Sequence, residues 1–383
     1  MKSKKILAIL MAALMTAALF TGCASTGSTP AGGGSGGAEN TENQSWMIGF
    51  NIWGAGTPTF DVMGDETAYT INLLGGDYSR VSDENQADKE LQNIQNFISA
   101  GVDGIVMQTA ANPVLPQAAE ACKNAQIPFV IPTFVGLEED RAEISANNEY
   151  YVGSIEADLY MDGYLMGKAA ADDGHKTAVL LGGNIGDINF EKRIEGFTDA
   201  FVNEGGGTII DSARCTSPAE GLEKCTALLS AHKDAECVYA MVGDYGTAAV
   251  AAEDTLGLDM PVYVSNANKD DVPYIKDGRI AAAAGGNDLA SNMAVCLLFN
   301  YLDGHPIVDA NGKSPEFKIS PFLVTLDNVE EFETYFYADG QHPFTDEALH
   351  SLTWRFNPDV SYQTYEEFIA NSMTLEALVA AHQ

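Results

Sequence analysis

The chain has 383 residues, of which 46% are hydrophobic and 9% are aromatic. This length and apolar content suffice for a large buried core and favour two compact lobes over one ordinary domain. The 54 acidic and 20 basic residues give a formal net charge of −34. Because that charge repels phosphate backbones and anionic lipid surfaces, the composition argues against a nucleic-acid partner.

Residues 1–22 have the pattern of a secretory signal peptide. Lysines near the start precede an apolar run over 6–20, which is too short to span a bilayer comfortably. The sequence Phe-Thr-Gly-Cys at 20–23 resembles the bacterial lipobox, although leucine is usual where Phe20 stands. The resemblance implies that Cys23 is lipidated and becomes the mature N-terminus. Secretion with Cys23 unmodified is the alternative.

Residues 23–45 are rich in Gly, Ser, Thr and Asn and lack apolar periodicity, so we expect a flexible tether. The cysteines beyond position 23 form no Cys-x-x-Cys and no Cys/His pairing, and we therefore predict no metal site. No cofactor motif occurs in a suitable structural context, so no cofactor is expected. Cys215 and Cys225 are compatible with a disulfide and equally with buried free thiols.

From Trp46 onward, short apolar runs alternate with longer helical patterns. In the first half, strands are predicted over 47–52, 104–107 and 128–132, and helices over 58–74, 86–100 and 113–125. Antiparallel neighbours would need only short turns between strands, so this order predicts parallel sheet.

The second half repeats the scheme. Strands are predicted over 177–181, 208–212, 237–242, 262–265 and 280–284, and helices over 188–203, 218–232, 247–256 and 289–301. Segments 103–107 and 127–131 each recur 133 residues later, at 236–240 and 260–264. This spacing predicts an α/β fold with two similar Rossmann-like lobes. Helices over 329–337 and 365–381 are expected in a C-terminal extension, 327–383, that packs across the body.

In open α/β sheets, ligands bind beyond the carboxyl ends of the strands. Two such lobes facing each other would therefore form a cleft from the residues that follow each strand. The positions singled out in this way are Trp53, Thr57, Phe60, Gln108, Thr133, Phe134, Asn184, Asp187, Arg193, Thr216, Asp244, Tyr245, Asn266, Asn268, Asn287 and Asp288. Aromatic rings stack on apolar sugar faces, and planar amide, carboxylate and guanidinium groups pair with hydroxyls. The set therefore suits a polyhydroxylated small molecule.

Several segments, in this order, carry a family resemblance between about residues 46 and 326. They are IGFNIWGAGTPTF (48–60), ELQNIQNFISAGVDGIVM (90–107), AAEACKNAQIPFVIPTF (118–134), SANNEYYVG (145–153), RIEGF (193–197) and MPVYVSNAN (260–268). The body resembles the type I periplasmic sugar-binding proteins of bacterial ABC importers, the ribose- and galactose-binding group.

The resemblance implies two lobes joined by a multi-strand hinge. The N-terminal lobe would comprise 46–148 with 287–317, and the C-terminal lobe 149–286 with 318–326. The chain would cross between the lobes near 147–150, 285–288 and 316–320.

The resemblance also implies ligand contacts on both lobes. In the first lobe they fall on Trp53, Thr57, Thr59, Phe60, Gln108, Thr133 and Phe134; in the second, on Arg193, Thr216, Gly243 or Asp244, Asn266, and Gly286 or Asn287. The sequence departs from the pentose binders, which commonly have Asp-Arg where Thr133 and Phe134 stand and aspartate where Asn266 stands. These departures leave the sugar itself open.

Each candidate contact has a structural alternative. Trp53 and Phe134 could instead fill the interface between the lobes. Arg193 could pair with a glutamate on its own helix. Asp244 could cap the helix that begins beside it.

These observations together predict an extracytoplasmic, lipid-anchored solute-binding protein that captures a sugar or similar polyol and delivers it to an ABC permease. A ligand sensor for a membrane kinase or chemoreceptor is one alternative. An extracellular enzyme acting on glycosides is another, with Asp187 and Asp244 as its paired carboxylates. The enzyme hypothesis is weakened because the sequence shows no Ser/His/Asp or Cys/His arrangement.

Overall fold

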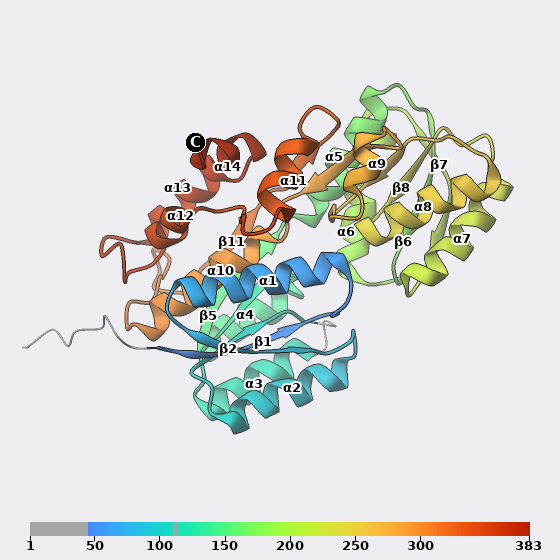
Figure 1. Ribbon diagram of the computed structural model, residues 1–383. Coiled ribbons are helices and arrows are strands. Elements are labelled where there is room, and N and C mark those ends of the chain that lie inside the picture. The colour runs from blue at the N-terminus through green and yellow to red at the C-terminus, as the bar shows by residue number, and fades with distance from the viewer. Residues whose placement is uncertain (1–44, 110–113) are drawn as a thin grey trace, which may run out of the picture. The chain divides into compact units, whose positions relative to one another are not determined.

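The computed structural model describes residues 45–109 and 114–383 (Figure 1). The predicted signal peptide, Cys23 and nearly all of the predicted tether lie outside the described residues. In the described part, strands and helices alternate through most of the chain, and the predicted elements occur in the predicted order with others between them.

The first sheet contains six parallel strands in the order β11-β5-β4-β3-β1-β2. Its strands are β1 (Met47–Ile52), β2 (Asp77–Ser82), β3 (Gly104–Met107), β4 (Phe129–Thr133), β5 (Tyr151–Ala157) and β11 (Glu316–Ile319). The helices of this lobe are α1 (Pro58–Leu73), α2 (Ala87–Ala100), α3 (Leu115–Ala125), α4 (Glu138–Asn147) and α10 (Leu289–Leu302).

Helices cover both faces of the first sheet, with α2 and α3 on one face and α1 and α10 on the other (Figure 1). Side chains of β3 alternate accordingly: Ile105 and Met107 pack with α2 and α3, whereas Val106 packs in the cluster that contains α10. Gly49 of β1 is needed for this packing, because a Cβ there would lie 2.6 Å from the Phe97 ring. The central strands are therefore buried on both faces, which explains why β1, β3 and β4 are nearly continuous apolar runs.

The second sheet has the order β12-β10-β9-β8-β6-β7, in which β12 alone runs antiparallel to its neighbour. Its strands are β6 (Thr177–Gly182), β7 (Thr208–Arg214), β8 (Cys237–Ala240), β9 (Val262–Val264), β10 (Ile280–Gly285) and β12 (Phe322–Val324). Its helices are α5 (Leu159–Asp172), α6 (Ile188–Phe197), the π-helical turn η3 (Thr198–Glu204), α7 (Pro218–Ala231), α8 (Gly243–Leu256) and α9 (Val272–Lys276).

The two sheets repeat one topology. Strands β1, β3 and β4 hold the same places in the first sheet as β6, β8 and β9 in the second. The segments that recur 133 residues apart belong to these matched strands, so the predicted pair of similar α/β lobes is confirmed.

The predicted position of the first lobe crossing is wrong. Strand β5 pairs with β4, so the chain stays in the first lobe through Ala157 instead of leaving it near 147–150. The C-terminal lobe therefore does not begin at 149. The second and third connections, 286–288 and 320–321, lie at or beside the predicted positions. The segment SANNEYYVG resembles a lobe crossing because Asn147 and Asn148 favour a turn. In the structure that turn leads into β5 of the same lobe.

The C-terminal extension contains α11 (Val329–Tyr337), α12 (Asp346–Ser351), α13 (Tyr362–Ser372) and α14 (Leu375–Ala381). The first of these helices agrees with the prediction over 329–337. The predicted helix over 365–381 is two helices, because Thr374 caps α14 through a bond from the backbone N–H of Ala377.

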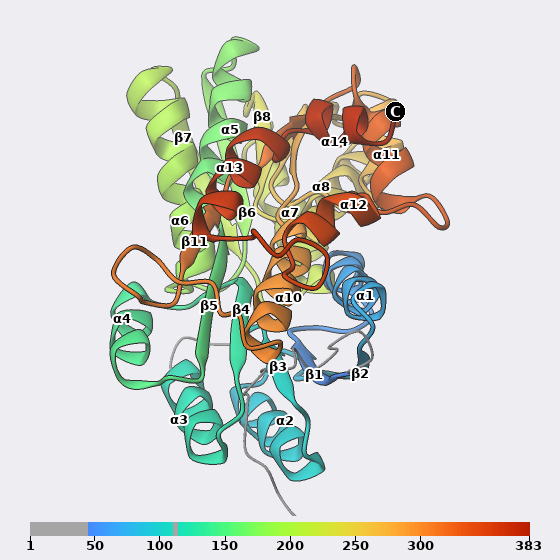
Figure 2. The same ribbon diagram turned by 90° about the vertical axis from the view of Figure 1, so that its left-hand side faces the viewer.

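The extension packs against elements of both sheets. In α11, Phe332 and Phe336 form an aromatic cluster with Phe322 of β12. Helix α12 lies over α10 (Figure 2), and there the Asn300 side chain binds the backbone of Leu352 and Trp354. The extension thus connects to both lobes.

Cys215 and Cys225, whose pairing the sequence left open, are buried free thiols in the structure. Within residues 45–109 and 114–383, no helix is long and apolar enough to cross a membrane. No group of His, Cys, Asp or Glu in the same residues is arranged to hold a metal ion.

Candidate functional site

A cavity of about 330 Å³ lies at the carboxyl ends of strands from both sheets. Seven of the ten binding residues that the sequence predicted line this cavity: Trp53, Thr57, Phe60, Phe134, Arg193, Asp244 and Asn266. Of the other positions that follow a strand, Asn184, Asp187, Thr216 and Tyr245 line it as well.

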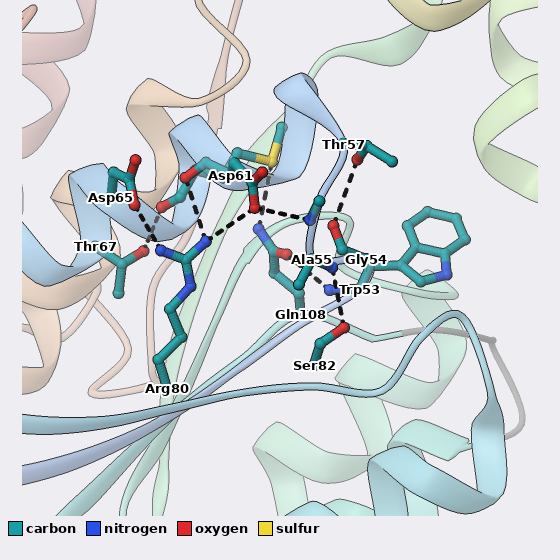
Figure 3. A network of polar contacts seen from close by, with 12 residues as sticks. Trp53, Gly54, Ala55, Thr57, Asp61, Asp65, Thr67, Arg80, Ser82 and Gln108 are labelled. Atoms are coloured by element: carbon teal, nitrogen blue, oxygen red, sulfur yellow. Dashed lines mark hydrogen bonds and ion pairs between the residues drawn. The ribbon is translucent and has the colours of Figure 1, made fainter. Parts of the chain in front are cut away.

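Trp53 and the loop after it are held by a polar network (Figure 3). The backbone N–H groups of Trp53 and Ala55 donate to Gln108 Oε1 at 3.4 Å and Ser82 Oγ at 3.1 Å. The N–H of Gly56 donates to Asp61 Oδ1 at 3.0 Å, and Arg80 pairs with the same oxygen at 3.3 Å. These bonds fix the loop at the end of β1, and the Trp53 ring with it.

Three aromatic rings form the wall contributed by the first sheet. The centroid of the Trp53 ring lies 5.4 Å from those of both Phe60 and Phe134, and the rings meet at 53° and 77°. Trp53 and Phe134 are at most 7% exposed. The rings pack on one another and also line the cavity, so filling the interface does not prevent them from facing a ligand.

Arg193 is the central polar group of the second lobe. It is 1% exposed, and its Nε donates to Oδ2 of the fully buried Asp162 at 2.8 Å. The alternative in which Arg193 pairs with a glutamate on its own helix is therefore wrong. The N–H donors on Nη2 find no partner among the described residues, so a ligand in the cavity could accept from them.

Two glycines allow α5 and α6 to approach closely enough for this ion pair. A Cβ at Gly163 of α5 would lie 2.0 Å from the Arg193 carbonyl oxygen, and one at Gly196 of α6 would lie 2.0 Å from that of Tyr160. Any side chain larger than a hydrogen atom at either position would push the two helices apart.

Asp244 lies in the first turn of α8 but makes no capping bond, so that alternative is wrong. Its Oδ1 accepts from Asn268 Nδ2 at 3.1 Å. Burial is the main cause that raises the pKa of Asp244 to about 6, and the nearby charge of Asp270 adds to it. Asp187, by contrast, caps α6 by accepting from the backbone N–H of Asn189. Burial raises its pKa as well.

Asn266 follows β9 with a left-handed backbone, φ 49°. Its side chain is 4% exposed, lines the cavity, and has no partner for Nδ2 among the described residues. It thus presents a second N–H donor beside that of Arg193.

Three predicted contacts, Gln108, Thr133 and Asn287, do not line the cavity and instead support it. The Gln108 side chain binds the backbone of Trp53. The Thr133 hydroxyl donates to the Asn287 carbonyl oxygen at 3.4 Å, and Asn287 Nδ2 donates to Asp162 Oδ2 at 3.1 Å. Following a strand places a residue at the right edge of the sheet, but its hydrogen bonds decide where the side chain points.

Some residues that line the cavity are not predicted from the sequence. Glu84 and Asn85 follow β2, a strand that the apolar pattern did not predict, and the Trp53 indole N–H donates to Asn85 Oδ1. Phe190 in the first turn of α6 adds a ring to the second wall. The signal that identifies it is an aromatic residue in the first turn of a helix that follows a strand, the same place that Phe60 holds in α1.

Comparisons with known proteins agree with this architecture. Residues 48–306 match the family model of the periplasmic binding protein domain. The ribose import binding protein of Salmonella typhimurium is 24% identical over 226 residues, which cover 59% of this chain and 74% of the relative.

Solved structures show the same fold. A sugar ABC transport substrate-binding protein from Bordetella parapertussis superposes with a TM-score of 0.67 at 21% identity, covering 77% of this chain and 93% of the other. A periplasmic solute-binding protein from Actinobacillus succinogenes with bound D-allose gives 0.67 at 18% identity, covering 75% and 99%.

Proposed function

Because the chain belongs to the family of periplasmic binding protein domains, we propose that it captures a sugar or similar polyol between its lobes and delivers it to an ABC permease. The observation that carries this proposal is the cavity at the strand ends of both sheets. Aromatic rings on one wall and N–H donors on the other match the apolar and hydroxyl-bearing faces of such a molecule. The names of two similar proteins mention ribose and D-allose, which supports the same ligand class.

Ligand binding would work by closing the lobes. A ligand favours the closed state only by the free energy of its differential contacts with the two states. A molecule that contacts Trp53 and Phe134 on one side and Arg193 and Asn266 on the other meets that condition. The three connections between the lobes would serve as the hinge.

Calorimetric titration with D-ribose, D-allose, L-arabinose, nucleosides and amino acids tests the proposal. We expect a sugar to bind, and we expect Arg193→Lys to weaken it by about tenfold or more because lysine lacks the planar fork of donors. Lysine keeps the charge opposite Asp162, so the fold should survive. Arg279→Lys, a control outside the cavity whose side chain is 32% exposed, should bind normally. Failure of every ligand class to bind would refute the proposal.

We propose further that the chain is a binding protein without catalytic activity. Asp187 and Asp244 both line the cavity, so incubation with chromogenic glycosides is the appropriate assay. Turnover that disappears in Asp187→Asn or Asp244→Asn would establish the enzyme instead. A sensing role would appear as binding of the liganded form to a kinase or chemoreceptor, with uptake unchanged when the gene is deleted.

Lipid attachment at Cys23 completes the proposal, although that residue lies outside the described part of the chain. The support is the lipobox-like sequence at 20–23. Metabolic labelling with a palmitate analogue should tag the wild-type protein and not Cys23→Ser. Equal labelling of both would refute the anchor.

A further inference from the structure

The charges that line the cavity do not balance. Glu84, Asp187 and Asp244 contribute three carboxylates, whereas Arg193 alone among the described lining residues carries a permanent positive charge. That charge is already opposed by Asp162, which is completely buried at 2.8 Å from it. The cavity wall therefore has an excess of negative charge, in a chain whose net charge is −34. Such a field attracts cations and repels anions.

The excess negative charge is least compensated at Asp244. Glu84 pairs with Lys89 at 2.5 Å, and Asp187 lies at the positive end of α6. No lysine, arginine or histidine of the described chain forms an ion pair with Asp244, and none lowers its pKa. Within the described residues, its side chain accepts a hydrogen bond from the neutral amide of Asn268.

Of the acidic groups near Asp244, Asp270 makes this imbalance stronger. Asp271, from the same segment after β9, is fully buried, and burial raises its pKa well above the usual range, which favours its neutral form. The Asn268 amide that binds Asp244 also donates to Thr59 Oγ1 at 3.3 Å. Burial together with the charge of Asp270 raises the pKa of Asp244 to about 6. No positive group of the described chain offsets that effect at this carboxylate.

The aromatic walls favour a cation as well. The faces of aromatic rings attract positive charge, most strongly for tryptophan. Trp53, Phe60 and Phe134 line one wall, and Phe190 and Tyr245, whose centroids are 6.5 Å apart, line the other.

The ligand must also bear oxygen atoms. Arg193 Nη2 and Asn266 Nδ2 belong to side chains at least 96% buried, line the cavity, and have no partner in the described chain. Donors in that situation require acceptors from the ligand, because an unsatisfied buried donor is costly.

Resting on the proposed function, we propose that the cavity selects a polyhydroxylated cation, an amino sugar, whose ammonium group binds at Asp244 among the aromatic rings. Its hydroxyl oxygens accept from Arg193 and Asn266. A neutral sugar would leave Asp244 without a compensating charge, and an anionic sugar acid would be repelled.

The test uses matched ligands on the full mature chain. D-glucosamine, D-galactosamine and D-mannosamine are each titrated at pH 7 beside the parent neutral sugar and the N-acetyl derivative, which keeps the nitrogen but lacks the charge. We expect at least one amine to bind about tenfold or more tightly than both of its matched neutral ligands.

Two further measurements identify the carboxylate. Asp244→Asn should reduce the preference for the amine to less than about threefold, whereas Asp259→Asn, an exposed acid of the same lobe, should keep it. In the wild type, amine affinity should fall as the pH is lowered from 7 to 5, because Asp244 takes up a proton through its pKa of about 6. The N-acetyl ligand should show no such fall.

The outcomes separate the two proposals. Binding of neutral sugars without preference for the amines overturns this inference and leaves the proposed function intact. Binding of no sugar of any kind overturns both. A folded Asp244→Asn variant with an undiminished preference for the amine overturns the assignment to Asp244, and the pH series decides the matter if that variant does not fold.

Discussion

Asp162→Asn removes one charge from the most deeply buried ion pair of the cavity with almost no change in shape. Arg193 and Asp162 are 1% and 0% exposed, so the remaining guanidinium could not be solvated. Breaking a buried pair by removing one partner costs about 3–5 kcal/mol, because an uncompensated charge stays in the interior. The weakened acceptor for Asn287 Nδ2 adds to this loss. We therefore expect the free energy of unfolding to fall by about 3–5 kcal/mol.

Urea denaturation followed by far-ultraviolet circular dichroism measures this loss. A double variant, Asp162→Asn with Arg193→Met, removes both charges and should recover about 2 kcal/mol or more relative to Asp162→Asn alone. Asp277→Asn is the surface control, because its partner Arg279 is 32% exposed, and it should cost less than about 1 kcal/mol. A loss for Asp162→Asn as small as that of the control would show that water reaches the guanidinium and would refute the reasoning.

Three further variants test other parts of the structure. Arg355→Ala should lower the free energy of unfolding by about 2–4 kcal/mol in urea titrations, since it leaves Asp303, 2% exposed, without its two-bond partner. Glu253→Gln should raise it by about 1–3 kcal/mol at pH 8 and by less at pH 5. Burial raises the pKa of Glu253 from 4.5 to about 8, so between these pH values the folded wild type holds a proton that the unfolded chain has released. The free energy of unfolding of the wild type therefore falls as the pH rises through this range. Gly163→Ala should destabilise by about 1–3 kcal/mol and weaken ligand binding, because the new methyl group pushes away the backbone that carries Arg193; unchanged binding in calorimetry would contradict this.

The sequence predicted best those strands that are buried on both faces. All four residues of β3 are buried, so the run Gly-Ile-Val-Met is apolar throughout and stands out from its surroundings. Strand β2 lies at the edge of its sheet, half exposed, and Asp-Tyr-Ser-Arg-Val-Ser shows no apolar run. Missing this strand also meant missing Glu84 and Asn85, which follow it into the cavity.

Contacts between residues far apart along the chain could not be predicted from the sequence. The sequence offers glutamates on the helix of Arg193 as its partners, but Asp162 lies 31 residues earlier on α5. Only the close approach allowed by Gly163 and Gly196 brings the two helices together, and one sequence does not reveal which glycines meet. In β5, polar Ser154 and Glu156 interrupt the apolar pattern although both are buried, so no apolar run predicts this strand.

The internal repeat explains how one backbone geometry serves two purposes. Thr133 and Asn266 are 133 residues apart, lie at the carboxyl ends of matched strands, and both have a left-handed backbone, with φ of 62° and 49°. Asparagine tolerates this conformation, whereas a β-branched threonine adopts it only under constraint from its surroundings. Thr133 has that constraint: the N–H of Phe134 donates to the Pro132 carbonyl oxygen at 2.7 Å, and its own hydroxyl binds Asn287.

The two positions have consequently diverged. In the first lobe the turn at Thr133 places the next residue, Phe134, at the cavity. The Thr133 side chain itself binds the backbone of Asn287, in the connection that leads to α10. In the second lobe the corresponding residue itself faces the cavity with a free N–H. Matched left-handed positions therefore supply an aromatic face from one lobe and a hydrogen-bond donor from the other. A ligand must offer an apolar surface and an acceptor on opposite sides to satisfy both.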